Sequence, residues 1–536
     1  MKQRIHINQV GYICYKRKTA AYVGNLNSFA VINAKTQRVL CSGTLSKPVL
    51  DKASGDMVRI ADFSSFNMSG KYYIKIGIKK SFVFEISEKP YVNVKNLLIK
   101  GLYYNRCGCA LNNKNEEYPA NMCHCDVIPL LNSTLHKIDV SGGWHDSGNY
   151  GRYVPPACLA LGYLLNAFRL FPESFGDSAG IVSETTDLPD VLAEAKVELD
   201  WLLKMQAKDG GVYHKVAPLN AFEFTSPNED KSQHYVFPKS HHATADFTAC
   251  TALAASVFKN YDNGYAEKLK SAAVNSWIWL MNNPTFVKFE NPPSTHVNTA
   301  GDFVDDDIRD DMLWASCELY GMTGDDFFVE KILELYKQVN LTGFSNCHIG
   351  GFASLAYLHC NRERNAKVMS AINTSFRVAA DNIDSLAKSN PYFISKGYTD
   401  YVLGSNLKSM RDCIVLIIAN RLLGNDDYID TVVEQFNYIL GKNCMGMCFI
   451  TGIGANSVVH PHHRPSMTSY QHKPVPGLLV GGPNSERKDE YAKWSIPQDT
   501  PPARCYEDCD MSFSTNEPAI YNNGAAIFVE AFLETL

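Results

Sequence analysis

The sequence predicts a mainly α protein in which a small all-β sandwich precedes a large domain of helical hairpins. The chain has 536 residues, too many for one ordinary core, so at least two domains are expected. Residues 1–88 alternate apolar and polar positions in short segments, whereas the later apolar spacing is helical. The helical part also contains a weak internal repeat.

The first 88 residues contain five segments typical of β-strands: TAAYVGN, SFAVINA, MVRIADF, KYYIKIG and SFVFEIS. They are rich in Val, Ile, Tyr and Phe, and Gly, Asn, Asp and Ser lie between them. This pattern predicts a small antiparallel sandwich of immunoglobulin-like type over residues 1–88. The stretch SEKPYVNVK is the expected junction to a second domain, residues 89–536.

The second domain shows the apolar spacing i, i+3, i+4, i+7 of amphipathic helices. The clearest segments are LPDVLAEAKVELDWLLKMQ, DFTACTALAASVFKNY and MRDCIVLIIANRLLG. Two stretches, starting at Asp311 and Cys413, each run helix, glycine-containing turn, Asp-Asp-aromatic, helix. Repeated hairpins of this kind predict a closed α/α toroid. The long irregular loop from Thr451 to Asn516 is dense in His, Arg, Pro and Gly, which indicates a functional loop.

Composition excludes several classes of partner. The net charge is −5, so no basic surface favours nucleic acid or an anionic membrane. No apolar run approaches the length of a membrane span. The opening MKQRIHINQVGY lacks an apolar signal core, so we expect a cytoplasmic protein, or a secreted one if a signal has been removed. We also expect a monomer.

The sixteen cysteines are scattered, and most lie in apolar helical contexts typical of buried reduced thiols. This usage slightly favours a reducing compartment. One group differs, because Cys107, Cys109, Cys123, His124 and Cys125 lie close together in the sequence.

The glycine-rich stretch SGGWHDSGNYGRY carries the most specific signal. Glycine turns aim short polar side chains into clefts. Asp146 and Asn149 stand three residues apart in this turn. A carboxylate pair at that spacing would indicate a hydrolytic site, but the second member here is an amide.

Other single candidates are weak when taken alone. Glu517 precedes an apolar helix and could simply complement its dipole. His462 and Arg464 stand two apart in HPHHRPS, which could be a basic surface loop. His214, between apolar residues in GGVYHKV, could be a core histidine.

Taken together, these stretches resemble glycoside hydrolase family nine, the inverting cellulase-type enzymes with an (α/α)6 barrel. The resemblance covers nearly the whole chain. INQVGY looks like the opening strand of the family's immunoglobulin-like module, and SGGWHDSGNYGRYV is similar to its Gly-Gly-Trp-x-Asp-Ala-Gly-Asp motif. Further similar stretches follow in the family order: HHATADFTACTALAASVF, RDDMLWASCELYGMTGD, YVLGSNLKSM, FITGIGANSVVHPHHRPS, LLVGGPNS and NEPAIYNNGAAIF.

The resemblance implies three catalytic roles. Glu517 stands at the position of the general acid that protonates the leaving oxygen. Asp146 stands at the aspartate that helps hold the attacking water, and Asn149 at the general base. Inverting enzymes separate the acid and base carboxyls by about 6.5–9.5 Å, so we expect Glu517 to line one cleft with Asp146.

The resemblance also implies binding residues. His462 and Arg464 match a pair that orients the sugar, and they are expected in the same cleft. His214 matches a subsite histidine. Phe352 and Tyr357 match an aromatic pair that lines the subsites, a looser match. Aromatic faces pack on sugar rings, and His and Arg donate to hydroxyls.

An asparagine cannot take a proton from water at neutral pH, so three interpretations of position 149 stay open. Asn149 is an engineered replacement of aspartate, or it is natural with Asp146 as a poorer base, or the protein is a catalytically silent sugar binder. The family usually has alanine where this chain has Ser147. The motif therefore varies naturally, which supports the second interpretation.

The resemblance also implies a structural zinc site held by Cys107, Cys123, His124 and, as the expected fourth ligand, His145. Two cysteines and two histidines are a standard tetrahedral zinc set. Cys109 and Cys125 are alternative ligands, and free buried thiols are the alternative without metal.

Calcium also occurs in the family. The run DFVDDDIRDD could supply a calcium site, but solvated carboxylates at a helix start are the expected state. No organic cofactor is expected.

Two functions therefore stay open. The first is hydrolysis of β-1,4-glycosidic bonds in glucans or cello-oligosaccharides, in a disabled or slow form because of Asn149. The second is non-catalytic binding of the same β-1,4-linked oligo- or polysaccharides. Short oligosaccharides are more accessible substrates than fibres for a chain without an export signal. The sequence does not distinguish endo from exo action, or glucan from mannan, xyloglucan or glucosamine-containing chains.

Overall fold

The computed structural model describes residues 5–111, 122–182, 187–219, 224–291, 301–469 and 473–536. The chain forms two compact units, Met1–Gly101 with Arg377–Leu536, and Leu102–Phe376. It passes from the first unit to the second within α1 (Val92–Tyr104) and returns within α9 (Ala366–Ser389). Among the described helices, none is both long and apolar enough to cross a membrane.

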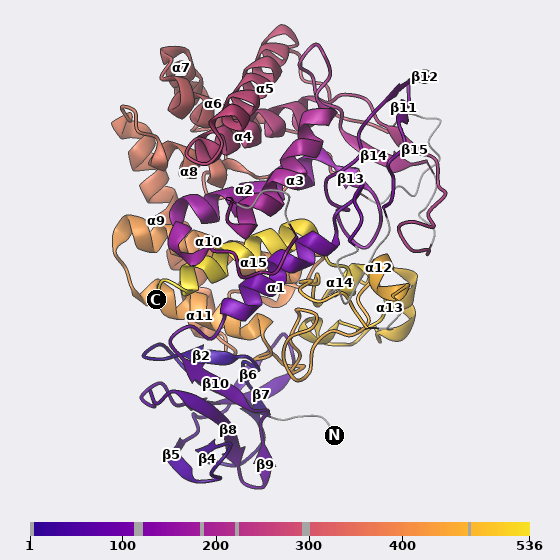
Figure 1. The fold of residues 1–536 in the computed structure, drawn as a ribbon. Coiled ribbons are helices and arrows are strands. Elements are labelled where there is room, and N and C mark those ends of the chain that lie inside the picture. The colour runs from indigo at the N-terminus through magenta and orange to yellow at the C-terminus, as the bar shows by residue number, and fades with distance from the viewer. Residues whose placement is uncertain (1–4, 112–121, 183–186, 220–223, 292–300, 470–472) are drawn as a thin grey trace. The chain divides into compact units, whose positions relative to one another are not determined.

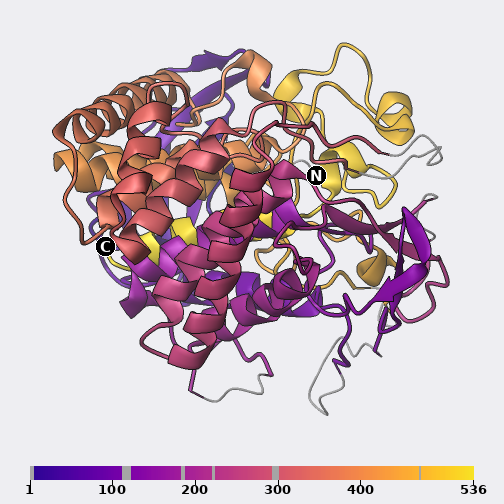
Figure 2. The ribbon, with the colours of Figure 1, turned by 90° about the horizontal axis from the view of Figure 1, so that it is seen from above.

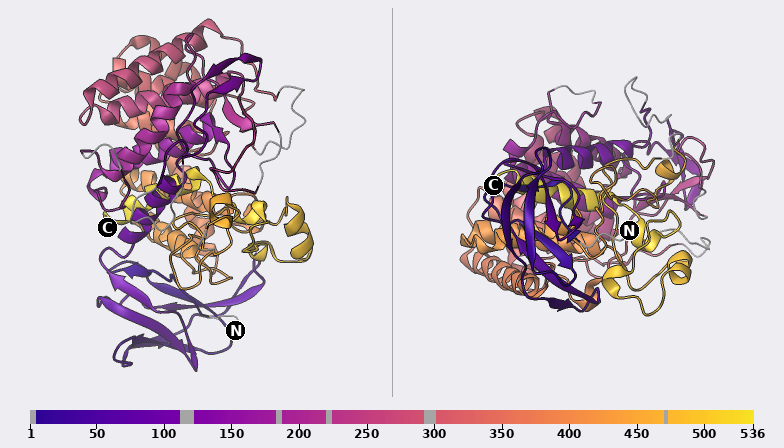
Figure 3. Two further views of the ribbon diagram at one scale, coloured as in Figure 1. Left: turned by 45° about the vertical axis from the view of Figure 1, so that its right-hand side comes forward. Right: turned by 90° about the horizontal axis from the view of Figure 1, so that it is seen from below.

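The first unit begins with a β-sandwich of two sheets (Figure 1, Figure 3). One sheet has the order β1-β3-β7-β6, and the other has the order β2-β10-β8-β4-β5 with β9 paired to β8. All five predicted strand segments form strands. The bounds are β1 Ile5–His6, β2 Gly11–Ile13, β3 Thr19–Val23, β4 Ser28–Asn33, β5 Val39–Thr44, β6 Val49–Asp51, β7 Asp56–Asp62, β8 Gly70–Ile76, β9 Lys79–Lys80 and β10 Phe84–Ser87.

Alternating positions of these strands build the sandwich core. Tyr12, Phe63 and Phe84 are buried there and meet edge to face or tilted, with ring centroids 5.1–5.6 Å apart. The sandwich is not purely antiparallel as predicted, because β2 and β10 pair in parallel.

The INQVGY stretch differs from its expected role as an opening strand, because residues 7–10 link β1 to β2. Asn8 in this link is buried, and its Nδ2 donates to Oδ1 of Asn437 at 2.8 Å. Gln9 donates to the carbonyl of Gly446 at 2.8 Å. The stretch therefore attaches the sandwich to the helical part of the same unit.

Two buried helices form the centre of that helical part. α10 (Ser405–Leu423) and α15 (Ile520–Leu533) pack against each other, and α11 (Asp427–Ile439) packs on α10. The remaining helical segments are short: η2 Tyr398–Asp400, α12 Arg464–Met467, α13 Glu490–Ser495, η3 Pro502–Arg504 and α14 Phe513–Asn516. Most of them lie in the long loop that the sequence singled out.

The second unit alternates buried helices with amphipathic partners. α2 packs on α4, α4 on α6 and α6 on α8, and these four helices are buried over most of their length. α3, α5 and α7 cover α2, α4 and α6, and α4 and α5 lie side by side (Figure 1, Figure 2). The bounds are α2 Val154–Leu170, η1 Pro172–Ser174, α3 Asp190–Met205, α4 His241–Phe258, α5 Asn263–Asn282, α6 Arg309–Thr323, α7 Asp326–Leu335 and α8 Gly350–His359.

The predicted hairpin repeat corresponds to α6–α7 and α10–α11. In both hairpins the first helix ends at a glycine in the left-handed conformation, Gly324 at φ 74° and Gly424 at φ 66°. Glycine adopts this conformation without the strain of a Cβ. Asp325 then caps α7 by accepting the amide of Phe327. The sequence repeat thus encodes a turn as well as two helices.

The second unit also contains a small sheet that the sequence did not predict. Its order is β12-β11-β15-β14-β13, formed by Ser133–Ile138, Ile128–Leu130, His234–Val236, Lys215–Pro218 and Arg152–Tyr153. β13 follows the turn that holds Asp146 and Asn149, and β14 follows His214. β10 ends at Ser87 and α1 begins at Val92, but the exact domain boundary at residue 88 stays a prediction.

Candidate active site and metal centre

The turn at residues 141–153 holds Asp146 and Asn149 in the second unit. Gly143 in this turn has a left-handed backbone with φ 74°. A Cβ there would lie 2.8 Å from the ring of Trp201, so only glycine fits without displacing the indole. Gly143 therefore allows close packing on Trp201, and this packing fixes the path of the chain into Asp146.

Asp146 and Asn149 are both buried, with 2% and 4% of their surface exposed. The amide of Asp146 donates to the carbonyl of Gly151 at 3.0 Å. Oδ1 of Asn149 accepts the amide of Gly151 at 2.8 Å, and its Nδ2 donates to Oγ of Ser147 at 3.1 Å. Asn149 thus closes the turn with both ends of its side chain.

Two glutamates of α3 support this turn, and the sequence analysis missed them. Glu198 accepts the backbone amide of Trp144 at 2.5 Å, and Glu194 accepts the indole N–H at 2.7 Å. Arg106 pairs with Glu194 at 2.7 Å. Burial raises the pKa of Glu198 well above its ordinary value, although the Trp144 amide opposes this. The two glutamates are four residues apart and therefore share one face of a helix, which was the signal available in the sequence. The helical pattern alone could not show which residue they bind.

The predicted general acid lies in the first unit, between α14 and α15. Glu517 is half-buried. Its carbonyl accepts the amide of Gly481 at 3.0 Å, and Pro518 forms an isolated antiparallel bridge with Val480. Extended pairing of this kind fixes the backbone from which the Glu517 side chain projects.

The same unit brings His462 and Arg464 to the acid segment. The amide of His462 donates to the carbonyl of Asn516, the residue before Glu517, at 3.0 Å. Nδ1 of His462 donates to the carbonyl of Asp510 at 2.5 Å, which sets the tautomer of the ring. Arg464 begins α12 and is 7% exposed. The structure therefore bonds the backbone of His462 to the residue before Glu517, with Arg464 two residues further along. Whether the three side chains share one cleft with Asp146 stays a prediction.

His214 is fully buried in the second unit. Its Nδ1 lies 2.8 Å from Oγ of Ser240, its Nε2 lies 2.7 Å from the carbonyl of Asp302, and its ring stacks on Phe289. Burial, followed by the charge of His242, lowers its pKa well below the ordinary value, so the ring is neutral. Both nitrogens have protein partners, which is the geometry of the core-histidine alternative.

Phe352 and Tyr357 lie in the core of the second unit. Phe352 is fully buried, and its ring packs on Tyr163, Trp314 and Phe344 with centroids 5.1–5.2 Å apart. The hydroxyl of Tyr357 accepts the amide of Asn365 at 2.6 Å. Phe352 and Tyr357 are 0% and 2% exposed, and this burial argues against the subsite role predicted for both residues.

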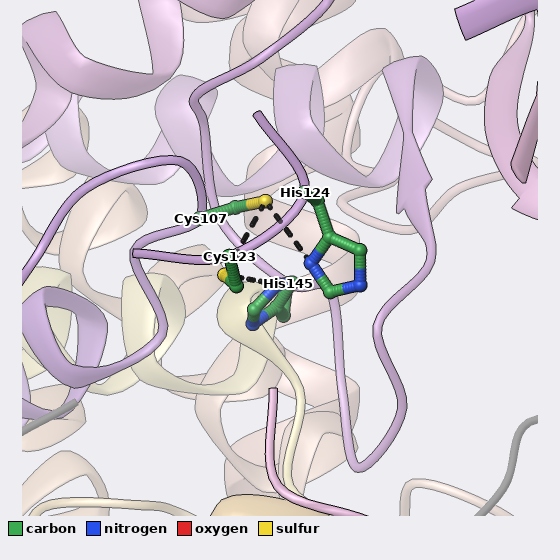
Figure 4. A group of neighbouring side chains, drawn as sticks. All are labelled: Cys107, Cys123, His124 and His145. Carbon is green, nitrogen blue, oxygen red and sulfur yellow. Dashed lines mark hydrogen bonds between the residues drawn. The ribbon is translucent and has the colours of Figure 1, made fainter. Parts of the chain in front are cut away.

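The four predicted metal ligands converge on one point (Figure 4). Cys107 Sγ lies 3.7 Å from Nδ1 of His124 and 4.0 Å from Sγ of Cys123, which lies 3.8 Å from Nε2 of His145. Tetrahedral zinc with standard bond lengths separates its ligand atoms by about 3.3–3.8 Å. The donor set and its spacing therefore fit zinc, while Cys125 is exposed and directs its thiol to backbone carbonyls.

The electrostatics of the cluster favour the zinc-binding form at two of the four residues. The hydrogen bond to Cys107 raises the pKa of the Cys123 thiol. Although burial lowers the pKa of His124, its hydrogen bonds to Asp230 and Cys107 raise it to about 9. Cys107 and His145 shift in the direction that zinc requires. Burial alone would raise the pKa of Cys107, but the hydrogen bond from Cys123 and the charge of Arg152 lower it well below the ordinary value. Burial lowers the pKa of His145. A thiolate and a neutral imidazole are the forms that bind zinc.

Asp230 supports this cluster from outside, and no motif in the sequence indicated it. Its Oδ2 lies 3.2 Å from Nε2 of His124 and 3.3 Å from Nε2 of His234. The two rings stack with centroids 4.7 Å apart. A carboxylate on the second nitrogen of a ligating histidine orients the ring toward the metal.

The acidic run before α6 is not solvated as expected. Asp305, Asp310 and Asp311 are 5%, 5% and 0% exposed, whereas Asp306 is exposed. Asp310 accepts the amide of Ile349 at 2.6 Å. The prediction of solvated helix-start carboxylates is therefore wrong for three of these residues, because the run turns inward against α4.

Comparison with known proteins identifies the class. The model of glycosyl hydrolase family 9 matches residues 91–530, and the model of the cellulase N-terminal Ig-like domain matches residues 1–81. The chain therefore belongs to glycosyl hydrolase family 9.

Similar proteins cover the whole chain. A cellodextrinase of Butyrivibrio fibrisolvens is 33% identical over 98% of both chains, and endoglucanase D of Acetivibrio thermocellus is 31% identical over 98% of this chain and 83% of its own length. A structure described as AaCel9A in complex with cellobiose-like isofagomine matches with TM-score 0.93, 28% identity and full coverage of both chains. A mutant of the thermostable endoglucanase from Alicyclobacillus acidocaldarius matches with TM-score 0.92, 29% identity and full coverage of both chains. These matches confirm the predicted fold class, an (α/α)6 barrel preceded by an immunoglobulin-like sandwich.

Proposed function

We propose that this protein hydrolyses β-1,4-glycosidic bonds of glucans or cello-oligosaccharides with inversion, slowly in the form that carries Asn149. The proposal rests on one hydrogen bond: the amide of His462 donates to the carbonyl of Asn516, the residue before Glu517, at 3.0 Å. An acid residue and a sugar-orienting pair are thereby held on one local scaffold. The relatives named cellodextrinase and endoglucanase support the same substrate class.

The residues divide the work as inverting hydrolysis requires. Glu517 donates a proton to the leaving glycosidic oxygen. The water that attacks the opposite face of the sugar is positioned by Asp146, and position 149 is the site of the general base. His462 and Arg464 donate hydrogen bonds to sugar hydroxyls.

Asn149 lowers turnover more than binding. An amide orients water but accepts no proton from it at neutral pH. The acid and the sugar-binding pair are unchanged, so affinity for oligosaccharides is retained. This is also the observation that favours the second candidate function, a non-catalytic binder of β-1,4-linked oligo- or polysaccharides.

Short cello-oligosaccharides are the proposed substrates. The cellodextrinase relative matches this chain over 98% of both lengths, including the sandwich. A monomer acting on soluble oligosaccharides, without nucleic acid or membrane partners, agrees with the composition.

We also place a structural zinc ion on Cys107, Cys123, His124 and His145. When bound, zinc would fix these four side chains together. His145 precedes Asp146, and its amide donates to the carbonyl of Asn105 at 2.8 Å. The metal would thus hold the catalytic turn against the end of α1.

The test is product analysis on a panel of oligosaccharides at high enzyme concentration. Cellotetraose, cellopentaose, a xyloglucan oligosaccharide and mannotetraose are incubated with the protein, and the anomer first released is followed by proton NMR. The α-anomer from cello-oligosaccharides is expected. Release of the β-anomer would overturn inversion. Cleavage of mannotetraose alone would overturn the substrate class, and binding of cellotetraose without any cleavage would favour the binder.

A further inference from the structure

A group of exposed apolar side chains lies in the long loop of the first unit. Trp494 is 81% exposed, Met511 51% and Phe513 40%. Tyr491, one helical turn before Trp494 on α13, is partly exposed, and the centroids of these two rings lie 5.9 Å apart. Single exposed apolar residues are common, whereas a group of them marks a binding surface. We call Tyr491, Trp494, Met511 and Phe513 the exposed strip.

The helix that carries Trp494 is firmly anchored. Ala492, Ile496 and Cys505 are buried and form a small apolar cluster beneath α13. Asp489 caps the first turn of α13, because its carboxylate accepts the amide of Ala492 at 2.5 Å. Trp494 therefore projects from a fixed helix and not from a loose loop. A ligand that stacks on its ring has little backbone to order.

The same cap attaches α13 to the segment of the proposed acid. The carboxylate of Asp489 also accepts the backbone amide of Ser514 at 2.9 Å. Ser514 belongs to α14, the short helix that ends one residue before Glu517 and lies near α13 (Figure 1). One buried carboxylate thus fixes the position of Trp494's helix relative to the backbone that leads into Glu517.

A second connection joins the exposed strip to His462. The hydroxyl of Tyr491 is hydrogen-bonded to the thiol of Cys509. The next residue, Asp510, accepts Nδ1 of His462 through its carbonyl at 2.5 Å. The ring of Phe513 lies 6.1 Å from the ring of His462, between centroids. The strip therefore extends from the residue proposed to orient the reacting sugar out to α13.

The chemistry of the strip favours a neutral sugar chain. Flat aromatic faces pack on the apolar faces of sugar rings. The charged neighbours on α13, Glu490 and Lys493, pair with each other at 2.7 Å. The surroundings of Trp494 therefore carry no excess charge that would attract an ion or a charged polymer.

We propose that the exposed strip binds sugar units of a β-1,4-glucan that lie beyond the bond being cleaved, with Trp494 as the outermost platform. This inference rests on the proposed function and deepens it, because it makes chain length a determinant of affinity. A chain of sugar rings that contacts both His462 and Trp494 gains area that a shorter chain does not reach. The protein should consequently bind cellohexaose more tightly than cellotriose.

The test is calorimetry of the full chain with cellotriose and cellohexaose, whose slow proposed turnover permits titration of intact oligosaccharide. Trp494→Ala should weaken cellohexaose binding by about tenfold and cellotriose binding much less. Because Trp494 is exposed, the denaturant unfolding midpoint should not change. Unchanged cellohexaose affinity, or equal losses for both sugars, would overturn the proposal. Binding of neither sugar by the unmodified chain would overturn the proposed function and this inference with it.

Matched variants separate stacking from general apolar contact. Trp494→Phe keeps a ring and should retain part of the cellohexaose affinity, whereas Trp494→Leu should lose as much as Trp494→Ala. Full affinity in the leucine variant would refute stacking. Tyr15→Asn is the control, because Tyr15 is another exposed ring, 77% exposed, and its backbone at φ 59° suits asparagine. A dimer in sedimentation that Trp494→Ala dissociates would show that the strip binds a second copy, against the proposal.

Discussion

Position 149 offers the sharpest test of the proposed chemistry, through the change Asn149→Asp. The present amide accepts from the Gly151 amide at 2.8 Å and donates to Ser147 Oγ at 3.1 Å. An aspartate keeps the first bond. Its other oxygen can accept from Ser147, because the hydroxyl can rotate to donate. The turn should therefore keep its shape.

The expected gain follows from the value of a general base. Base assistance is worth about 10²–10⁴ in rate, or about 2.7–5.4 kcal/mol of activation free energy. The substitution also buries a carboxylate at a position that is 4% exposed. Hydrogen bonds from Gly151 and Ser147 to the charge offset much of this, so we expect the free energy of unfolding to fall by no more than about 2 kcal/mol.

The assay compares kcat on cellotetraose for the chain with Asn149 and for Asn149→Asp, with affinity measured by calorimetry. Ser147→Ala is the control, because it alters the same turn without supplying a base. We expect a gain of two or more orders of magnitude in kcat for Asn149→Asp, the scale of a restored base, little change in affinity, and no gain for Ser147→Ala.

An unchanged rate in a folded, binding-competent Asn149→Asp variant would refute the role assigned to position 149. Asp146→Ala in the original chain then separates the remaining interpretations. Further loss of residual activity would identify Asp146 as the working base, and no measurable activity in either protein would identify a binder.

Three further predictions test other groups. In the Asn149→Asp background, Glu517→Gln should lower kcat on cellotetraose by about 10²–10⁴ and much less on an aryl cellobioside whose leaving group needs no acid; equal losses on both would contradict the acid role. Cys123→Ser should abolish stoichiometric zinc in metal analysis, while the control Cys125→Ser should retain it, and the reverse would show that the ligand choice is wrong. Burial lowers the pKa of His6 to about 4, so below pH 6.5 the unfolded state binds a proton that the folded state refuses. Stability should fall by about 3 kcal/mol from pH 6.5 to 4. Denaturant unfolding should show a flatter pH profile for His6→Asn, and parallel profiles would count against this assignment.

The sequence was most informative where local pattern and burial agree. All five strand segments named from alternation form strands in the sandwich. In β10 the alternation is directly visible, because Phe84 and Ile86 are buried while Glu85 and Ser87 are only partly buried. The hairpin repeat was also predictable. Gly324 and Gly424 adopt the left-handed conformation, which glycine takes without strain. A glycine after a helical pattern therefore predicts where the first helix of each hairpin ends.

Pattern failed where long-range contacts override local preference. The small sheet β11–β15 is built from strands as short as Arg152–Tyr153, too short for any alternation to show. Asn8 and Gln9 interrupt an apparent opening strand because they bind groups more than 400 residues away in the sequence. Such partners leave no local signal.

The candidate site shows the same division. Cys107, Cys123, His124 and His145 converge as the sequence analysis predicted, because thiol and imidazole clusters have few other uses. The resemblance matched Phe352 to an aromatic residue that lines the sugar subsites, yet Phe352 is fully buried and lies in α8, a helix that is buried over most of its length. The sequence of a helix does not show whether protein or sugar covers the ring face of an aromatic side chain on it.

The proposed metal ligands are bonded to the turn that holds Asp146 and Asn149, and this bears on the interpretation of the test at position 149. The amide of Cys107 donates to the Gly143 carbonyl at 2.8 Å, so a proposed metal ligand is bonded to the glycine that enters the turn. His145 supplies a second proposed ligand next to Asp146. The backbone on the N-terminal side of Asp146 is therefore fixed by groups that a change at residue 149 does not touch. A rate change in Asn149→Asp would consequently report the chemistry of one carboxylate and not a rebuilt turn.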